Sequence, residues 1–306
     1  MAERQPGGPL FGISITPTAQ NPQLIFDQAR LADDLNLYMV SVQDHPYNAA
    51  FFDTWTLLSA LGSVTQHVRL MPNVVNLPLR PPAVLAKSAA TLDILTNGRF
   101  EMGLGAGAFW EGVVAYGGPQ RSPGQAVDAL VEAMQVMRAL WQPAGPRQQA
   151  VSFSGKYYQL NEAQPGPVPR HSIGIWLGAL GPRMLHITGQ LADGWIPSSS
   201  YIPPGDILPR QDAIDEAAQQ AGRSPAAIHR AYNVMGIILR PGAPQTRARR
   251  PGIIVGPISH WVDELTRYYR DLRMDSFHFW PHAGEEEAQI RLFAEEVVPA
   301  VRKNLA

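Results

Sequence analysis

Short apolar segments alternate with longer segments of helical periodicity along the whole 306-residue chain, and this alternation constrains the fold more than any other feature. Strands that alternate with helices form parallel sheets, and eight such units favour a closed barrel over an open sheet. We therefore predict a single (β/α)8 TIM barrel over residues 1–306, with small insertions. The eight predicted strands are residues 11–15, 38–42, 68–71, 100–104, 173–177, 194–197, 232–239 and 276–280.

The helices between these strands carry recognisable starts. Asp53 or Thr54 is a plausible N-cap, and Pro82 falls in a first turn, where a missing N–H costs nothing. Residues 151–158 alternate around Gly155 like a small hairpin, and we interpret 142–172 as an insertion that contains it. The predicted helices are residues 22–35, 53–65, 82–95, 125–141, 183–191, 207–221, 258–272 and 285–301.

Composition excludes several classes of function. Lys and Arg total 25 against 26 Asp and Glu, so nothing suggests a nucleic-acid partner. The absence of Cys excludes a thiol nucleophile, Cys-ligated zinc and disulfides. Residues 1–9 lack the apolar core of a signal peptide, and no apolar run approaches the roughly 18 residues of a membrane span. We expect a cytoplasmic protein without a membrane partner.

In a barrel of this kind the active site lies where strands end and helices begin. Asp44 and His45 follow the second predicted strand, and an adjacent acid and imidazole can supply or accept a proton near neutral pH. We take both as candidate catalytic residues, with Asp44 orienting the His45 ring. The alternative is that Asp44 caps a loop and His45 packs against Pro46 and Tyr47.

Two glycine-containing turns are candidate binding segments. Residues 178–183 follow a buried strand and open a helix, where free backbone N–H groups can hold an anion and Arg183 can add a charged contact. Residues 103–107 permit close approach to a flat ring. Each turn is explained equally well as a simple strand-to-helix connection, the first with Pro182 at the first helical position.

Metal chemistry is not expected. The eight His residues do not cluster along the chain, and His278, on the eighth strand, is explained as a core histidine. Paired carboxylates at strand ends, which a barrel hydrolase needs, are also missing. The arginines at 247, 249 and 250 follow the seventh strand and could meet an acidic cofactor tail.

Taken together, these segments resemble the luciferase-like monooxygenase superfamily over nearly the whole chain. The resemblance rests on an ordered set of motifs, which is far more specific than any one of them. The set comprises Asp44-His45, 71–83 (MPNVVNLPLRPPA), 85–93 (LAKSAATLD), 97–107 (NGRFEMGLGAG), 176–185 (WLGALGPRML) and 191–195 (LADGW).

The resemblance implies that a flavin or deazaflavin ring lies across the barrel mouth. Such proteins carry a non-prolyl cis peptide against the ring, which maps to Asn73-Val74. It also implies that the turn from residue 178 to 184 holds the cofactor phosphate and that an open pocket receives the substrate. The cofactor-binding candidates are Asn73, Val74, Gly105, Ala106, Gly107, Gly178, Ala179, Leu180, Gly181, Pro182, Arg183 and Met184, and the pocket candidates are Thr16, Tyr47, Phe109, Trp110 and Trp280.

Two chemistries of the family stay open. Reduced FMN could activate oxygen for a monooxygenase, or coenzyme F-420 could exchange a hydride. The Asp-His pair favours F-420, but its acidic tail needs basic partners, for which only Arg80, Arg183 and the arginines at 247–250 stand out. Ser14, Ile15 and Thr16 are plainer than the first strand of characterised deazaflavin dehydrogenases, which weakens the case for their sugar-phosphate substrate.

The family also contains barrels that bind flavin without catalysis, and this is the alternative function. The likeness further implies a homodimer that acts on a small molecule. It allows for a separate flavin or deazaflavin reductase as a partner.

Overall fold

A computed structural model describes residues 8–142, 150–240, 242, 251–282 and 285–306. Its main sheet runs in parallel through β3 (Arg69–Pro72), β2 (Met39–Val42), β1 (Leu10–Ile15), β12 (Ser276–Pro281), β10 (His229–Leu239), β9 (Gly194–Trp195), β8 (Ile175–Leu177), β5 (Met102–Gly105) and β4 (Val75–Asn76).

The two ends of this sheet meet, because β3 and β4 are halves of one strand interrupted at Asn73-Val74. β4 pairs with β5, and the Leu70 N–H of β3 donates to the carbonyl of Arg99, just before β5. The Glu101 N–H donates back to the Leu70 carbonyl. The predicted (β/α)8 barrel is therefore confirmed.

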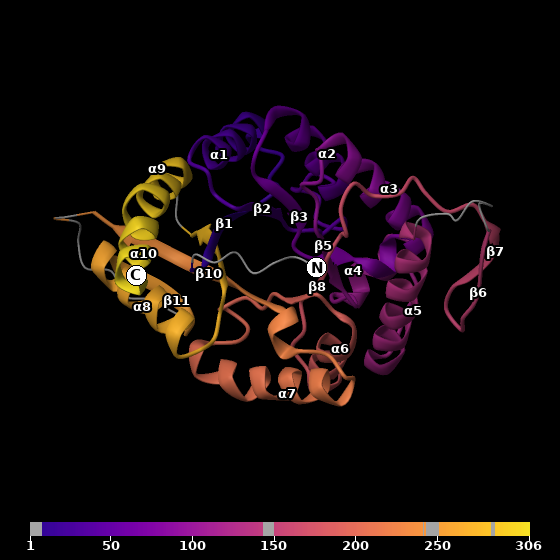
Figure 1. Cartoon of the computed structure of the whole chain (residues 1–306). Helices are drawn as coiled ribbons and strands as arrows, with labels where there is room; N and C mark the ends of the chain where they lie inside the picture. Colours follow the sequence, from indigo (N-terminus) through magenta and orange to yellow (C-terminus); the bar gives the residue numbers. More distant parts are fainter. Residues whose placement is uncertain (1–7, 143–149, 241, 243–250, 283–284) are drawn as a thin grey trace.

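Helices surround the strands on the outside (Figure 1). Asp53 caps the second helix, since its carboxylate accepts the Thr56 N–H at 2.8 Å, and Ser122 forms a capping box with Gln125. The helices are α1 (Pro22–Asp34), α2 (Thr54–Val64), α3 (Pro82–Leu95), α4 (Trp110–Ala115), α5 (Pro123–Trp141), α6 (Pro182–Leu191), α7 (Ile207–Gln220), α8 (Ile258–Arg270), α9 (Glu286–Leu292) and α10 (Val298–Leu305).

Four short elements complete the helical layer. Three are 3₁₀ turns, η1 (Leu77–Leu79), η2 (Pro204–Asp206) and η3 (Pro225–Ala227), and η4 (Phe293–Val297) is a π-helical segment that joins α9 to α10. None of the helices within the described ranges is long and apolar enough to cross a membrane.

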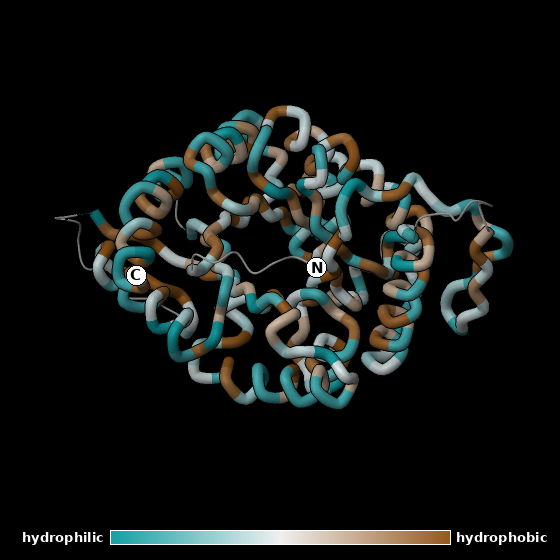
Figure 2. The backbone as a smooth tube through the Cα atoms, in the orientation of Figure 1, coloured by the Kyte–Doolittle hydropathy of each residue, from teal (hydrophilic) through white to brown (hydrophobic). Residues whose placement is uncertain are grey.

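Successive strand residues point alternately to the helices and into the barrel. In β2, Val40 and Val42 belong to the large core between sheet and helices, while Met39 belongs to a separate cluster inside the barrel. Figure 2 shows hydrophobic segments along the strands and polar ones on the outer helices. The interior cluster comprises Met39, Met71, Trp176, Ile196 and Ala231.

The structure adds elements that the sequence analysis missed. Helix α4 lies between the strand predicted at 100–104 and the helix predicted at 125–141, where no helix was predicted. Strand β11 (Ile253–Pro257) pairs with β10 beside the ring. Inside the predicted insertion, β6 (Val151–Ser154) and β7 (Gln159–Ala163) form a two-stranded sheet apart from the barrel, next to α5 (Figure 1). Its second strand lies wholly beyond residue 158, where the predicted hairpin ended.

Candidate active site

His45 lies between β2 and α2, at the carboxyl end of the barrel, and is partly buried. Its Nδ1 is 3.0 Å from the phenol oxygen of Tyr47. The rings of Tyr47, Phe51 and Phe109 lie 5.7 to 6.3 Å from its own, between centroids. Burial among these rings lowers the pKa of His45 despite the opposing charge of Asp44, so the ring is neutral at pH 7.

Asp44 is buried, and its carboxylate is saturated by other residues. The backbone N–H of Asn76 donates to it at 2.9 Å, and Arg80 makes two bonds, from Nε at 2.9 Å and from Nη2 at 2.7 Å. The prediction that Asp44 orients the His45 ring is therefore wrong, because the partner of Nδ1 is Tyr47. The alternative, in which Asp44 organises a loop, describes these contacts better.

Arg80 was a candidate for the acidic tail of a cofactor, but it is already paired. Its Nη2 also donates to Asp53, the N-cap of α2, at 2.6 Å. Burial works against the charged guanidinium, but hydrogen bonds and charge attraction from Asp44 and Asp53 outweigh burial and raise the pKa of Arg80. Arg80 therefore joins the ends of β2 and β4 to the start of α2.

Arg183 reaches towards α5 rather than over the mouth. Its guanidinium donates to the carbonyl of Gly124 at 3.0 Å and forms an ion pair with Asp128. This differs from the predicted contact between its side chain and a cofactor. The arginines predicted at 247, 249 and 250 lie outside the described residues.

The turn from β8 to α6 is anchored at its base. Ala179 is buried, and its carbonyl accepts the indole N–H of Trp195 at 3.0 Å. Leu180, the next residue, is exposed. The turn is thus held in place by the hydrogen bond at Ala179 and is exposed to solvent at Leu180.

The start of α6 fits the predicted phosphate contact. Gly181 is the N-cap, no side chain of the described residues caps this end, and Pro182 occupies the first helical position. The backbone N–H groups of Arg183 and Met184 therefore have no partner within the helix. A Cβ built on Gly181 would meet no atom of the described residues within 4 Å, so there is room for an anion.

The Asn73-Val74 peptide bond is cis, as the resemblance predicted. The Val74 side chain occupies space that Gly105 and Gly178 leave open. A Cβ would come within 2.8 Å of a Val74 methyl at Gly105 and within 3.2 Å at Gly178. These two glycines therefore accommodate Val74, in addition to any approach they allow to a ring.

The rest of the 105–107 segment packs against its own surroundings. Gly107 has φ +107°, and a Cβ there would lie 2.6 Å from Pro78 and 3.1 Å from Trp110. Ala106, beside it, is partly buried against the core. This segment fixes where α4 begins.

Beneath the mouth, five polar side chains that lie in or just after different strands form a connected layer, the polar floor. Asn73 Nδ2 donates to Asn233 at 2.8 Å and to Ser41 at 3.2 Å, and Ser41 lies 2.9 Å from Ser14. Asn233 also donates to Ser198 at 3.0 Å. The polar floor, Ser14, Ser41, Asn73, Ser198 and Asn233, holds the Asn73 side chain in place.

His278 lies next to this layer and is fully buried. Its Nδ1 is 3.4 Å from Ser41 Oγ, and burial lowers its pKa to about 4, so it is neutral at pH 7. The prediction of a satisfied core histidine is confirmed for its burial, but Nε2 has no hydrogen-bond partner in the described part of the chain.

Of the predicted pocket residues, Tyr47 and Phe109 adjoin His45, with 6.1 Å between their ring centroids. Thr16 and Trp280 form a second pair, because β1 and β12 are neighbours and the Trp280 indole donates to Thr16 at 3.1 Å. Trp110 opens α4 directly after Phe109. The structure thus places the predicted pocket residues at strand ends but in two groups.

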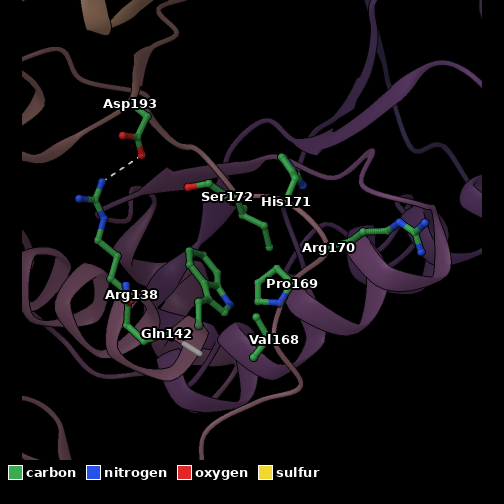
Figure 3. Close-up of a pocket in the computed structure, with 10 residues that line it drawn as sticks. Arg138, Gln142, Val168, Pro169, Arg170, His171, Ser172 and Asp193 are labelled. Carbon is green, nitrogen blue, oxygen red and sulfur yellow. Dashed lines mark hydrogen bonds and ion pairs between the residues drawn. The ribbon is translucent and has the colours of Figure 1, made fainter. Parts of the chain in front are cut away.

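A cavity of about 480 Å³ lies at the opposite end of the barrel (Figure 3). Ser172 and Ile173, which precede β8, and Asp193, which precedes β9, line it. Arg138 of α5 reaches Asp193 across it at 2.9 Å. Because barrels of this type place their chemistry at the carboxyl ends of the strands, this cavity is not the candidate site.

Sequence reasoning missed the partners that define the site. Asn76 and Arg80 both lie in the 71–83 motif. Both pair with Asp44, which lies 32 and 36 residues earlier, and this pairing can be recognised only from the folded structure. Phe51 carried no signal beyond being aromatic and near His45.

Comparison with known proteins places the fold in a family. The family model described as luciferase-like monooxygenase matches residues 10–298. The chain belongs to the luciferase-like monooxygenase family. The predicted family is therefore confirmed.

Curated members of this luciferase-like family include two informative relatives. The chain is 38% identical over 196 residues to a phthiodiolone/phenolphthiodiolone dimycocerosates ketoreductase of Mycobacterium tuberculosis, covering 62% of this chain and 48% of the relative. It is 32% identical over 236 residues to an F-420-dependent glucose-6-phosphate dehydrogenase of Nocardia farcinica, covering 73% and 67%. The chain thus spans about half the length of the mycobacterial relative.

Solved structures of luciferase-like proteins share the architecture. An F-420-dependent secondary alcohol dehydrogenase, in complex with an F-420–acetone adduct, aligns with a TM-score of 0.83 at 21% identity over 96% of this chain and 99% of its own. A long-chain alkane monooxygenase aligns with a TM-score of 0.78 at 14% identity over 97% and 92%. At these identities the likeness shows the fold alone. The prediction of an oxidoreductase using F-420 or FMN agrees with these relatives.

Proposed function

We propose that this protein is an F-420-dependent oxidoreductase that interconverts a ketone and a secondary alcohol, with His45 as the proton donor and acceptor. The observation that carries the proposal is the setting of His45. Its ring is neutral, lies at a strand end and has Nδ1 against Tyr47, while Nε2 has no partner in the described part of the chain. Nε2 is therefore the atom that can exchange a proton with a substrate.

Tyr47 is the positioning residue for this exchange. Its phenol oxygen lies 3.0 Å from His45 Nδ1 and accepts a hydrogen bond in the tautomer that carries the hydrogen on Nδ1. An imidazolium always carries a hydrogen on Nδ1, so an acceptor at Nδ1 suits both protonation states of His45. Only Nε2 then has to gain or lose a proton.

Two relatives named above support a carbonyl substrate, since one is a ketoreductase and the other a secondary alcohol dehydrogenase. Bound F-420 would supply hydride exchange at its C5. The backbone N–H groups of Arg183 and Met184 would hold its phosphate, because the start of α6 is uncapped and has room. In oxidation, His45 Nε2 would then accept the hydroxyl proton. In reduction, the ring would first take up a solvent proton at Nε2 and donate it to the carbonyl oxygen.

The test is turnover of ketones with reduced F-420, and of secondary alcohols with oxidised F-420, by wild type and His45→Ala. Removing a catalytic acid or base costs a factor of about 10² to 10⁴ in rate, whereas F-420 affinity should be unchanged. His260→Ala is the control, because His260 is exposed on α8. Product formation with reduced FMN and oxygen, and none with F-420, would instead identify a monooxygenase.

We also propose that the protein works in the cytoplasm as a homodimer and receives its reduced cofactor from a separate reductase. The support is family likeness. Light scattering coupled to gel filtration tests the dimer, and a monomer at micromolar concentration would contradict it.

A further inference from the structure

Exposed apolar side chains gather around the barrel mouth. They follow β5, β8 and β9, which are consecutive strands of the barrel, so their loops are neighbours. We call this set the apolar rim: Phe109, Val114, Tyr116, Leu180 and Tyr201, exposed by 46% to 68%. Exposed apolar groups that gather at a site mark a surface that binds an apolar ligand.

Phe109 has the most unusual setting in the rim. It precedes α4 in the left-handed region, at φ +54° and ψ 55°, a conformation that costs a bulky residue about 1–2 kcal/mol. Burial of the ring does not offset this, because Phe109 is 64% exposed. The contacts of the exposed Phe109 ring at the mouth must therefore explain why this residue has a strained conformation.

Phe109 stands beside the residue that exchanges the proton. Its ring meets the His45 ring edge-on, at 6.3 Å and 83°, and lies 6.1 Å from the Tyr47 ring. Tyr201, across the mouth, is close enough to Tyr47 to help raise the pKa of that phenol, although burial is the main cause. The rim is therefore continuous with the site of proton transfer.

We propose that the substrate is an uncharged ketone or secondary alcohol with a long apolar chain, and that Phe109 is the specificity-determining residue against which this chain packs. The inference rests on the proposed function. Rim side chains are aromatic or aliphatic, and the nearby Arg80 and Arg183 form ion pairs with carboxylates. A chain that covers the rim gains affinity with every methylene group it buries.

The experiment measures kcat/KM with reduced F-420 for straight-chain methyl ketones from 2-butanone to 2-decanone. Each added methylene group should raise kcat/KM by about two- to fourfold in wild type, the effect of burying part or all of a methylene. Phe109→Ala should flatten this dependence while F-420 affinity is kept, and Phe109→Leu should restore it. Leu95→Ala is the control, because Leu95 is exposed at the far end of α3 and should leave it unchanged.

The inference would be overturned by equal kcat/KM for short and long ketones, by the same chain-length dependence in wild type and Phe109→Ala, or by a preference for glucose 6-phosphate over 2-decanone. Loss of F-420 affinity in Phe109→Ala would also overturn it, by assigning the ring to the cofactor. If no ketone or alcohol turns over, the proposed function fails. Chain-length dependence of 2-alkanone binding, followed by Trp fluorescence, then still decides for or against the rim.

Discussion

At the scale of single residues, the buried carboxylate of Asp44 lies between Arg80, which is always charged, and His45, the proposed proton donor. The Asp44 side chain is 1% exposed, is bound by Arg80, and directly precedes His45 in the chain. The negative charge of Asp44 favours the protonated form of His45, whereas burial of His45 opposes it. Arg80 neutralises the charge of Asp44. The protonation of His45 is thus set by residues from two strands.

This balance predicts a pH dependence. Alcohol oxidation needs neutral His45, and burial lowers the pKa of His45, so its rate should rise with pH around a midpoint below the ordinary value of about 6.5. Arg80→Gln leaves Asp44 buried without a cation, which should move the midpoint upwards and cost about 3 kcal/mol of stability. pH–rate profiles and urea unfolding measure the two effects.

The double variant Asp44→Asn with Arg80→Gln is the matched control, because it removes both charges. It should return the midpoint towards that of wild type. If Arg80→Gln shifts neither the midpoint nor the stability, the carboxylate is solvated in solution and the argument fails.

At the scale of elements, His171 ties α3, β5 and β8 together at the amino end of the barrel. Its Nδ1 is 2.7 Å from Asp93 of α3, and its Nε2 is 3.3 Å from Glu101, just before β5. Burial opposes the charge, but hydrogen bonds to Asp93 and Glu101 raise the pKa of His171 to about 9. Arg69 Nη2, 2.7 Å from Nε2, opposes the charge on the ring, but the carboxylates of Asp93 and Glu101 outweigh it. The charged ring therefore stabilises the folded state.

A raised pKa fixes the sign of the stability change. The contribution of His171 is complete below the unfolded pKa of about 6.5 and is lost as pH rises through about 9. Wild type should lose on the order of 2 kcal/mol of unfolding free energy across this window, and His171→Gln should lose less. Urea unfolding at pH 6 and pH 9.5 measures it, with exposed His67→Gln as the control; parallel losses in wild type and His171→Gln would contradict it.

The elements show how far the sequence could predict this structure. Helix α3 has the predicted bounds, because Pro82 fixes its start and the Asn97-Gly98 turn follows its end. Helix α4 escaped prediction since its N-cap, Phe109, has a conformation that bulky residues rarely adopt. The place of Asp44 and His45 followed from the strand order, but the Arg80 and Tyr47 contacts did not, because patterns do not encode side-chain partners.

At the scale of the whole molecule, barrel closure depends on a close approach between β5 and the end of β3. A Cβ on Gly103 would lie 2.0 Å from the carbonyl oxygen of Pro72. No rotamer of a side chain can relieve a clash with backbone. A residue other than glycine at 103 must push the two strands apart.

Gly103→Ala should therefore lower the free energy of unfolding by more than about 3 kcal/mol, which is beyond the range of most single substitutions. Gly205→Ala is the control, since a Cβ there meets no atom of the described residues within 4 Å, and it should stay within about 0.5 kcal/mol of wild type. Thermal and urea denaturation compare the two. Equal free energies of unfolding for the two variants would show that the barrel can close with β3 and β5 farther apart.

The polar floor also has a consequence for how this barrel can evolve. Asn73 has two partners, Asn233 has three, and Ser41 contacts Ser14, Asn73 and His278. Replacing one member by an apolar residue removes a hydrogen bond from each of its neighbours, and each lost bond costs about 0.5–1.5 kcal/mol. Single substitutions here should be purged, whereas compensated sets can persist. In diverging lineages these five positions should therefore change together, as one inherited unit.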